Sequence, residues 1–123
     1  MCVALSSGTS AVMYSLINIM SQGDNFVTAN QLYGGTYTMF DNILPEYGIN
    51  SKKVDITDFE AVESAIDEKT RAIYCETITN PGLVVADISA LADIAHSKGS
   101  PLIVDATFTT SAILKPFEFG ADI

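Results

Sequence analysis

The chain has 123 residues, which suffices for one domain with a buried core, and an apolar fraction of 48%, which is too high for a disordered chain. Its net charge of −9, from 15 acidic and 6 basic residues, argues against nucleic acid and against an anionic membrane surface as partners. Because no basic leader precedes an apolar run and no apolar run reaches about 18 residues, we expect neither a signal peptide nor a transmembrane helix.

The first predicted elements are a strand and a helix. The segment CVAL (2–5) is typical of a short apolar strand or the remnant of one. Residues 7–24 carry apolar side chains at helical spacing, so they predict a helix that Ser7 or Thr9 caps and Gly23 ends.

A strand, a loop and a second helix come next. NFVTAN (25–30) predicts the strand, and QLYGGTY (31–37) predicts the loop. Residues 36–48 predict a helix that is broken near Pro45 and ends at Gly48.

The middle of the chain repeats this alternation. The more polar segment 49–56 predicts a short strand near a sheet edge. Residues 57–70 give the clearest helix pattern, with a cap at Thr57 or Asp58 and acids in the first half. RAIYCETI (71–78) predicts another strand.

The last third has the same order. TNPG (79–82) is a turn signal, residues 87–99 predict a capped helix that ends at Gly99, and PLIVDATF (101–108) predicts a buried strand. Connections of this length are too long for hairpins. We therefore expect an α/β fold, a mostly parallel sheet flanked by helices, in a single domain or part of one.

The cysteines and the histidine do not form a metal-binding pattern. Cys2 and Cys75 lie far apart among apolar neighbours, and His96 is the single histidine. We expect two free, buried thiols, no zinc site, and a reducing cytoplasmic compartment.

Polar and aromatic residues follow the predicted strands where a parallel sheet binds its ligands. Asp105 ends the last strand, Asn80 follows the strand before it, Tyr33 follows 25–30, and Ser7 and Gly8 open a helix. Because the carboxyl ends of parallel strands share one edge, these residues are expected at one rim.

Each of these residues also has a plain structural interpretation. Asp105 could cap a turn, Asn80 could only form a turn, Tyr33 could be a surface aromatic, and SSGTS could be an ordinary helix cap. Together they indicate a different chemistry. A helix N-terminus suits a phosphate, an aromatic ring can stack on a heterocycle, and a carboxylate can hold a ring nitrogen protonated, which are the needs of pyridoxal 5′-phosphate (PLP).

Several segments carry a family resemblance, in order and over nearly the whole chain: ALSSGTSAV, LYGGTY, VESAIDEKTRAIYCETITNPG, DISALADIAHSKGSPLIVDATF and KPFEFGADI. The sequence resembles the PLP-dependent enzymes of Cys/Met metabolism, which have fold type I, the aspartate-aminotransferase-like architecture. Within that family, LYGGTY, NILPEYGI, VDITD and AIDEKT are most similar to O-acetylhomoserine sulfhydrylases. Methionine γ-lyases and cystathionine synthases or lyases are close alternatives.

The resemblance implies a role for each candidate residue. The backbone N–H groups of Gly8 and Thr9 would bind the cofactor phosphate, with Ser7 beside them. Tyr33 would stack on the pyridine ring and act in proton transfer. The remaining cofactor contacts would come from Asn80 near the phenolic oxygen, Asp105 at the pyridinium nitrogen, and Thr107 at the other ring face.

Two departures from the family pattern affect this interpretation. Ala106 stands where the family has an asparagine, which removes an amide next to Asp105. The Schiff-base lysine follows the GADI strand in the family, and none of the five lysines lies in that context, with Lys115 expected at the surface. Residues 1–123 are therefore expected to be a partial PLP-binding large domain, truncated before the lysine segment and inactive alone.

The implied parent activity is γ-substitution on an activated homoserine ester by sulfide or a thiol, which gives homocysteine or methionine. The partners implied are a small amino-acid substrate and either a homo-oligomer or a complementing fragment, because a truncated sheet leaves apolar edges uncovered. A non-catalytic α/β assembly or weak cofactor-binding module is the alternative from another class. The absence of G-x-G-x-x-G after the first strand speaks against a nucleotide-binding domain.

Overall fold

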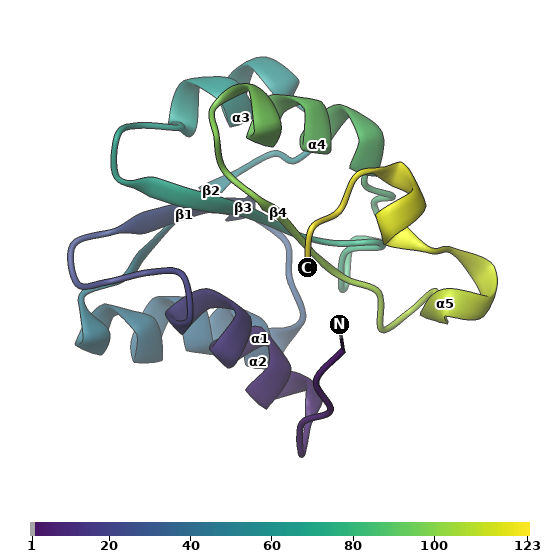
Figure 1. The fold of residues 1–123 in the computed structure, drawn as a ribbon, viewed down its shortest axis with the longest axis horizontal. Coiled ribbons are helices and arrows are strands. Elements are labelled where there is room, and N and C mark those ends of the chain that lie inside the picture. Colours follow the sequence, from purple (N-terminus) through teal and green to yellow (C-terminus); the bar gives the residue numbers. More distant parts are fainter. Residues whose placement is uncertain (1) are drawn as a thin grey trace.

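A computed structural model describes residues 2–123 and shows a four-stranded parallel sheet with helices on both faces (Figure 1). The spatial order of the strands is β2-β1-β3-β4, and each neighbouring pair is parallel. The strands are β1 (Asn25–Ala29), β2 (Asn50–Val54), β3 (Thr70–Glu76) and β4 (Leu102–Asp105). The predicted α/β fold with a parallel sheet is confirmed.

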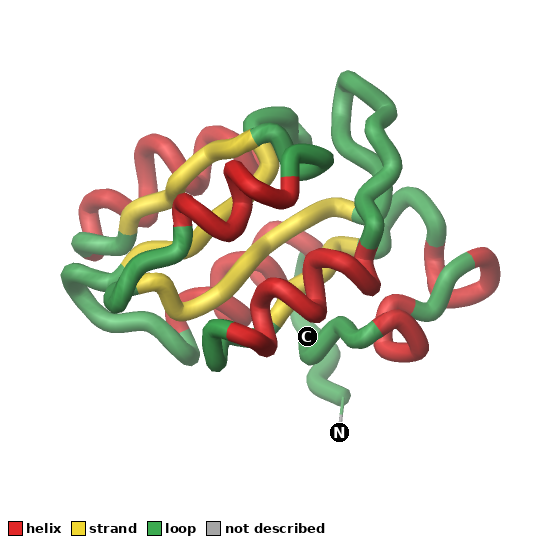
Figure 2. Tube along the Cα trace, turned by 90° about the horizontal axis from the view of Figure 1, so that it is seen from above, coloured by secondary structure: helices red, strands yellow, loops and turns green. Residues whose placement is uncertain are grey.

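The helices form two layers, one on each face of the sheet. In Figure 1, α1 (Gly8–Ile17) and α2 (Gly34–Thr38) lie below the sheet, and α3 (Phe59–Ala65) and α4 (Ile88–Ser97) lie above it. The short helix α5 (Thr110–Ile113) follows β4 at one end of the molecule. Figure 2 shows the strands running between the two layers.

The core lies on both faces of the two central strands. All five residues of β1 are buried, as expected for a strand covered on both sides. Below the sheet, the ring of Phe40 meets the rings of Phe26 and Tyr74 edge to face, at centroid distances of 4.7 and 5.1 Å. Above the sheet, Leu91 of α4 is fully buried.

Two helix caps follow the predicted chemistry. The carboxylate of Asp58 accepts a hydrogen bond from the N–H of Ala61 at 3.0 Å, and Asp87 does the same for Ala90 at 3.1 Å. Both helices start where the sequence indicates because these carboxylates satisfy N–H groups that have no partner within the helix.

Two predictions about the first half of the chain are wrong. Residues 2–5 form no strand; they are exposed, and the thiol of Cys2 is therefore not buried as predicted. The first helix ends at Ile17 and does not reach Gly23. The prediction for residues 36–48 agrees with the structure: α2 continues as a π-helix over Met39–Ile43, changes to a 3-10 helix over Leu44–Tyr47 next to Pro45, and ends at Gly48.

The edges of the sheet differ. β2 pairs only with β1 and is the polar edge strand that the sequence predicts. At the other edge, the last residues lie beside β4, where the N–H of Asp122 donates to the carbonyl of Leu102 and the N–H of Val104 donates to Ile123, both at 2.9 Å. Residues 121–123 form no assigned strand, although their backbone bonds to β4.

Within residues 2–123, no helix has both the length and the apolar character needed to cross a lipid bilayer.

Candidate functional site

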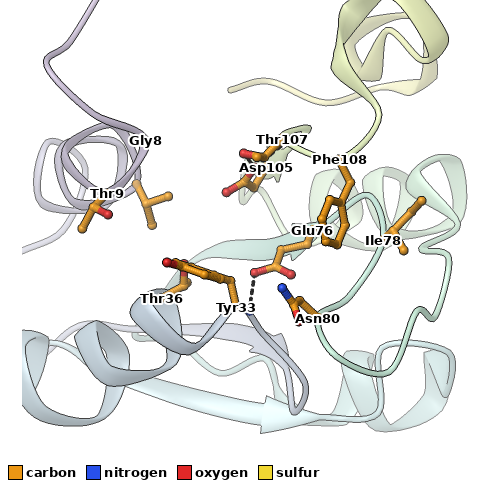
Figure 3. A pocket seen from close by; sticks show the side chains of 11 residues that line it. Gly8, Thr9, Tyr33, Thr36, Glu76, Ile78, Asn80, Asp105, Thr107 and Phe108 are labelled. Atoms are coloured by element: carbon orange, nitrogen blue, oxygen red, sulfur yellow. Dashed lines mark hydrogen bonds between the residues drawn. The ribbon is translucent and has the colours of Figure 1, made fainter.

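A cavity of about 220 Å³ opens at the carboxyl ends of the strands, the edge where parallel sheets bind ligands (Figure 3). Its walls come from the start of α1, the start of α2, and the segments that follow β3 and β4. Six of the seven predicted site residues line it: Gly8, Thr9, Tyr33, Asn80, Asp105 and Thr107. Segments far apart in sequence therefore meet at one rim.

The seventh predicted residue, Ser7, is the N-cap of α1. Its Oγ accepts a hydrogen bond from the N–H of Ser10 at 3.1 Å, and its carbonyl accepts one from the N–H of Ala11 at 3.0 Å. The N–H groups of Gly8 and Thr9 precede these and have no acceptor within the helix. The cap thus leaves two donors at the positive end of a ten-residue helix, beside the cavity.

Asp105 ends β4 on the opposite side of the cavity from α1 (Figure 3). Its Oδ1 accepts hydrogen bonds from the N–H of Thr107 at 2.8 Å and from the hydroxyl of the same residue. The Tyr74 hydroxyl lies 3.4 Å from Oδ2. Since Ala106 has no amide to offer, Thr107 and Tyr74 supply the side-chain support of Asp105 in this chain.

Tyr33 lies between these two groups. Its side chain is 56% exposed, and Figure 3 shows the ring at the floor of the cavity, below α1 and Asp105. Its backbone N–H donates to Oε1 of Glu76 at 2.8 Å. Asn80 follows β3 on the far side of Glu76 and is half-buried.

Sequence reasoning missed five residues of the cavity wall: Val12, Thr36, Glu76, Ile78 and Phe108. Of these, Glu76 carried a signal. It follows the apolar run of β3 just as Asp105 follows that of β4, and the two residues are register partners in the sheet. The other four are placed by helix and loop conformations that the pattern does not reveal.

Burial raises the pKa of three groups near the cavity. Burial raises the pKa of Glu76, and the charge of Asp105 adds to this, while the N–H groups of Tyr33 and Asn80 oppose it. Burial also raises the pKa of Cys75 to about 12, so this thiol, buried as predicted, is not a nucleophile. The same cause raises the pKa of Tyr74 well above its usual value, so its hydroxyl remains a donor.

The cavity therefore has two carboxyl groups, Glu76 and Asp105, but no lysine, arginine or histidine in its described wall. Its polarity is asymmetric, with free N–H donors at one end and carboxyl oxygens at the other. A flat, cationic heterocycle that carries a phosphate matches both ends and has an aromatic ring to stack on. The residues present thus fit pyridoxal phosphate. Residues 2–123 contain no cluster of His, Cys, Asp and Glu suited to a metal ion.

Lys115 and the other candidate lysines lie outside this cavity. Lys115 is exposed and pairs with Glu118 at 3.2 Å, which confirms the predicted surface position. Lys52, Lys53 and Lys98 also pair with acidic side chains elsewhere in the molecule.

Comparison with known proteins agrees with this geometry. The chain is 44% identical over 122 residues to a homocysteine synthase of Schizosaccharomyces pombe, and this match covers 98% of the chain and 28% of that protein. It is 43% identical over 120 residues to a cystathionine gamma-lyase of Bacillus subtilis, covering 98% and 31%. The chain thus spans less than a third of the length of these relatives.

A solved structure is similar as well. The O-acetylhomoserine sulfhydrylase of Wolinella succinogenes superposes with a TM-score of 0.93 at 42% identity, over 96% of this chain and 33% of that one. Residues 1–123 match the sequence family described as Cys/Met metabolism PLP-dependent enzyme along their whole length. The chain therefore belongs to the PLP-dependent enzymes of Cys/Met metabolism.

Proposed function

We propose that this chain forms the cofactor-binding part of an O-acetylhomoserine sulfhydrylase, an enzyme that makes homocysteine or methionine from O-acetylhomoserine and sulfide or a thiol. One observation carries the proposal. Free helix N–H groups, an aromatic ring and a supported carboxylate, from three segments, line a single cavity, and this combination supports the binding of PLP. The similarity to the Wolinella sulfhydrylase supports the substrate class.

In this proposal each side of the cavity holds one part of the cofactor. The N–H groups of Gly8 and Thr9 bind the phosphate, and Ser7 keeps the helix start in place. Tyr33 stacks on the ring, and Asp105 holds the ring nitrogen protonated. Two further contacts are assigned to Asn80, near the phenolic oxygen, and Thr107, at the other ring face. Bound PLP supplies the electron sink for reactions of an amino-acid substrate.

The described residues do not provide the lysine that this chemistry uses. Such a lysine binds the aldehyde and moves protons between substrate carbons, and none of the five in this chain lies in the cavity wall. We therefore expect residues 1–123 to bind PLP without a covalent link and to be inactive alone. The same proposal includes a cytoplasmic location. It also includes assembly of the chain, either with further copies of itself or with a complementing fragment.

A γ-lyase is the second candidate. The cystathionine gamma-lyase of Bacillus subtilis is 43% identical to the chain, almost as much as the homocysteine synthase. Because the same cavity would serve either reaction, the substrate has to be tested separately from cofactor binding.

Cofactor binding is tested with pyridoxine 5′-phosphate, which has no aldehyde and cannot react with surface lysines. We expect saturable binding of one probe per chain in a fluorescence titration, and weaker binding of pyridoxine, which lacks the phosphate. PLP followed by borohydride should label no single lysine in stoichiometric amount. A stoichiometric adduct at Lys115, with turnover of O-acetylhomoserine, would contradict the proposal.

The substrate class is tested in a chimera. Residues 1–123 replace the corresponding segment of the Wolinella sulfhydrylase. The absorbance of bound PLP reports whether the chimeric protein is folded. We expect the chimera to form homocysteine from O-acetylhomoserine and sulfide. A folded, PLP-loaded chimera that degrades cystathionine or methionine and does not use O-acetylhomoserine would support the lyase instead.

A further inference from the structure

Glu76 is a buried carboxyl group at the end of β3 to which the proposed function assigns no task. Only 5% of its surface is exposed, and its side chain faces the cavity between Tyr33 and Asn80 (Figure 3). Burying a carboxyl group is costly unless hydrogen-bond donors face it. The donors around Glu76 therefore indicate what it does.

Two backbone N–H groups face this carboxyl group. That of Tyr33 donates to Oε1 at 2.8 Å, and that of Asn80 stabilises the charged form of the same group. Tyr33 comes directly before α2, and Asn80 follows β3. One side chain thus connects two loops that are more than forty residues apart in sequence and that both line the cavity.

The ring of Tyr33 has few contacts of its own to fix its direction. It is 56% exposed, and Tyr33 makes no side-chain hydrogen bond as the N-cap of α2. The ring lies over the backbone of Gly35, where a Cβ atom would come within 2.7 Å of ring carbon Cε1. The place of the ring is therefore set by the backbone from Tyr33 to Gly35, and the hydrogen bond to Glu76 holds the beginning of that segment.

We propose that Glu76 is a positioning residue, whose carboxyl group holds the backbone of Tyr33 and thereby places the aromatic ring against the heterocycle of the cofactor. This inference rests on the proposed function, in which Tyr33 stacks on PLP. Glu76 acts through Tyr33 and need not touch the ligand.

If Glu76 acted only through its negative charge, its removal would have a different effect on ligand binding. Glu76 and Asp105 are register partners on neighbouring strands, which lie about 4.8 Å apart in a sheet. If only charge mattered, removal of one carboxylate would favour binding of an anionic phosphate ligand. If Glu76 positions Tyr33, loss of its acceptor oxygen weakens binding.

The test is a double-mutant cycle on the chain with pyridoxine 5′-phosphate as the probe. Glu76→Ala is expected to weaken binding about tenfold, the factor that corresponds to a lost hydrogen bond to a charged group. Glu76→Gln keeps an acceptor oxygen for the N–H of Tyr33 and should lose less. In a Tyr33→Ala background, either change should alter the affinity by less than about twofold, because the ring being positioned is gone.

Two readouts separate positioning from a general loss of stability. The induced circular dichroism of the bound probe, measured at saturation, should fall in Glu76→Ala, since the signal depends on how the ring is held. Thermal unfolding without ligand shows whether each variant is folded. Glu60→Ala, at an exposed position on α3, is the matched control and should leave both binding and dichroism unchanged.

The outcomes separate this inference from the proposed function. The positioning role would be overturned if the Glu76 changes lost equal affinity for the probe in the wild-type and Tyr33→Ala backgrounds. Tighter binding by Glu76→Gln would overturn it as well. If the Glu76→Ala variant does not fold, the test uses Glu76→Gln instead. Its smaller loss of probe affinity must then disappear in the Tyr33→Ala background. A wild-type chain that does not bind the probe at all would overturn the proposed function, and this inference with it.

Discussion

Among single residues, Asp105 has the most specific chemical task in the proposed site. Thr107 and Tyr74 orient its two oxygens, so the carboxylate is held toward the cavity without a cationic partner from the described chain. Asp105→Asn keeps the size of the side chain and removes the charge. We expect it to weaken binding of pyridoxine 5′-phosphate by about tenfold or more, the range of a hydrogen bond to a charged group.

The measurement for Asp105 is the same fluorescence titration, repeated across pH. In the wild-type chain the ultraviolet spectrum of the bound ring should remain that of the protonated pyridine to higher pH than in Asp105→Asn. Asp93→Asn, at an exposed position on α4, changes the same charge away from the cavity and should have no effect. Identical spectra for wild type and Asp105→Asn would remove the assigned role.

Some residues of the candidate site could be predicted from the sequence, and others could not. The rule that polar groups gather at the carboxyl ends of parallel strands brought Asp105, Asn80 and Tyr33 to one cavity. The same rule applied to IYCE would have found Glu76, but the predicted strand continued to Ile78 and hid the strand end. Phe108 could not be predicted, because it follows the strand in a turn whose direction no pattern gives.

At the scale of elements, the start of α2 controls the aromatic wall of the cavity. Gly35 allows the ring of Tyr33 to lie over the helix backbone, because a Cβ atom there would come within 2.7 Å of the ring. A Cβ atom at Gly34 would meet nothing within 4 Å. Gly35→Ala should therefore displace the Tyr33 ring and weaken probe binding several-fold, up to about tenfold, which is in the range of a lost ring-stacking interaction. Gly34→Ala should not.

This pair of substitutions is well matched, since both replace glycine by alanine within the first turn of one helix. Alanine has the higher helix propensity, so neither change should lower the melting temperature. The comparison is made by probe titration and thermal unfolding. Equal affinities for the two variants would show that the ring is not held by its approach to Gly35.

Element boundaries were harder to predict than the elements themselves. The apolar spacing of α4 and the apolar runs of β1 and β3 predicted these elements correctly. Burial of a helix on one face, or of a strand on both, leaves a clear pattern of apolar residues. The first helix was predicted too long because Met20 continues its apolar spacing and is buried, yet lies beyond the helix end. Residues 2–5 are apolar without a partner strand, and a sequence pattern does not show whether a partner exists.

In the molecule as a whole, two polar clusters lie at opposite ends of the sheet. The cavity lies at the carboxyl ends of the strands, and a second cluster surrounds Asp67, next to the amino ends of β1 and β3. Asp67 accepts hydrogen bonds from the side chain of Asn25 at 3.0 Å and the N–H of Lys69 at 2.9 Å, and it pairs with Lys52 at 2.7 Å. The hydroxyl of Thr70, the first residue of β3, also donates to Asp67 at 3.1 Å, so one aspartate contacts three strands, far from the proposed ligand.

This separation leads to a prediction about pH. The hydrogen bond from Lys52, followed by those from Asn25 and the N–H of Lys69, holds the pKa of Asp67 well below its usual value. A carboxyl group whose pKa is lower in the folded state binds fewer protons than in the unfolded chain. Its contribution to stability is present above the unfolded pKa of about 4 and is lost as the pH falls below it.

Asp67→Asn should therefore lower the melting temperature at pH 7, and the difference from wild type should shrink as the pH is taken from about 5 toward 2. The effect should be small, because the ion pair with Lys52 is half-exposed and such pairs contribute little. Affinity for pyridoxine 5′-phosphate at pH 7 should be unchanged, since the cluster and the cavity lie at opposite ends of the strands. A variant that binds the probe more weakly while it melts like wild type would show that the two ends are coupled through the sheet.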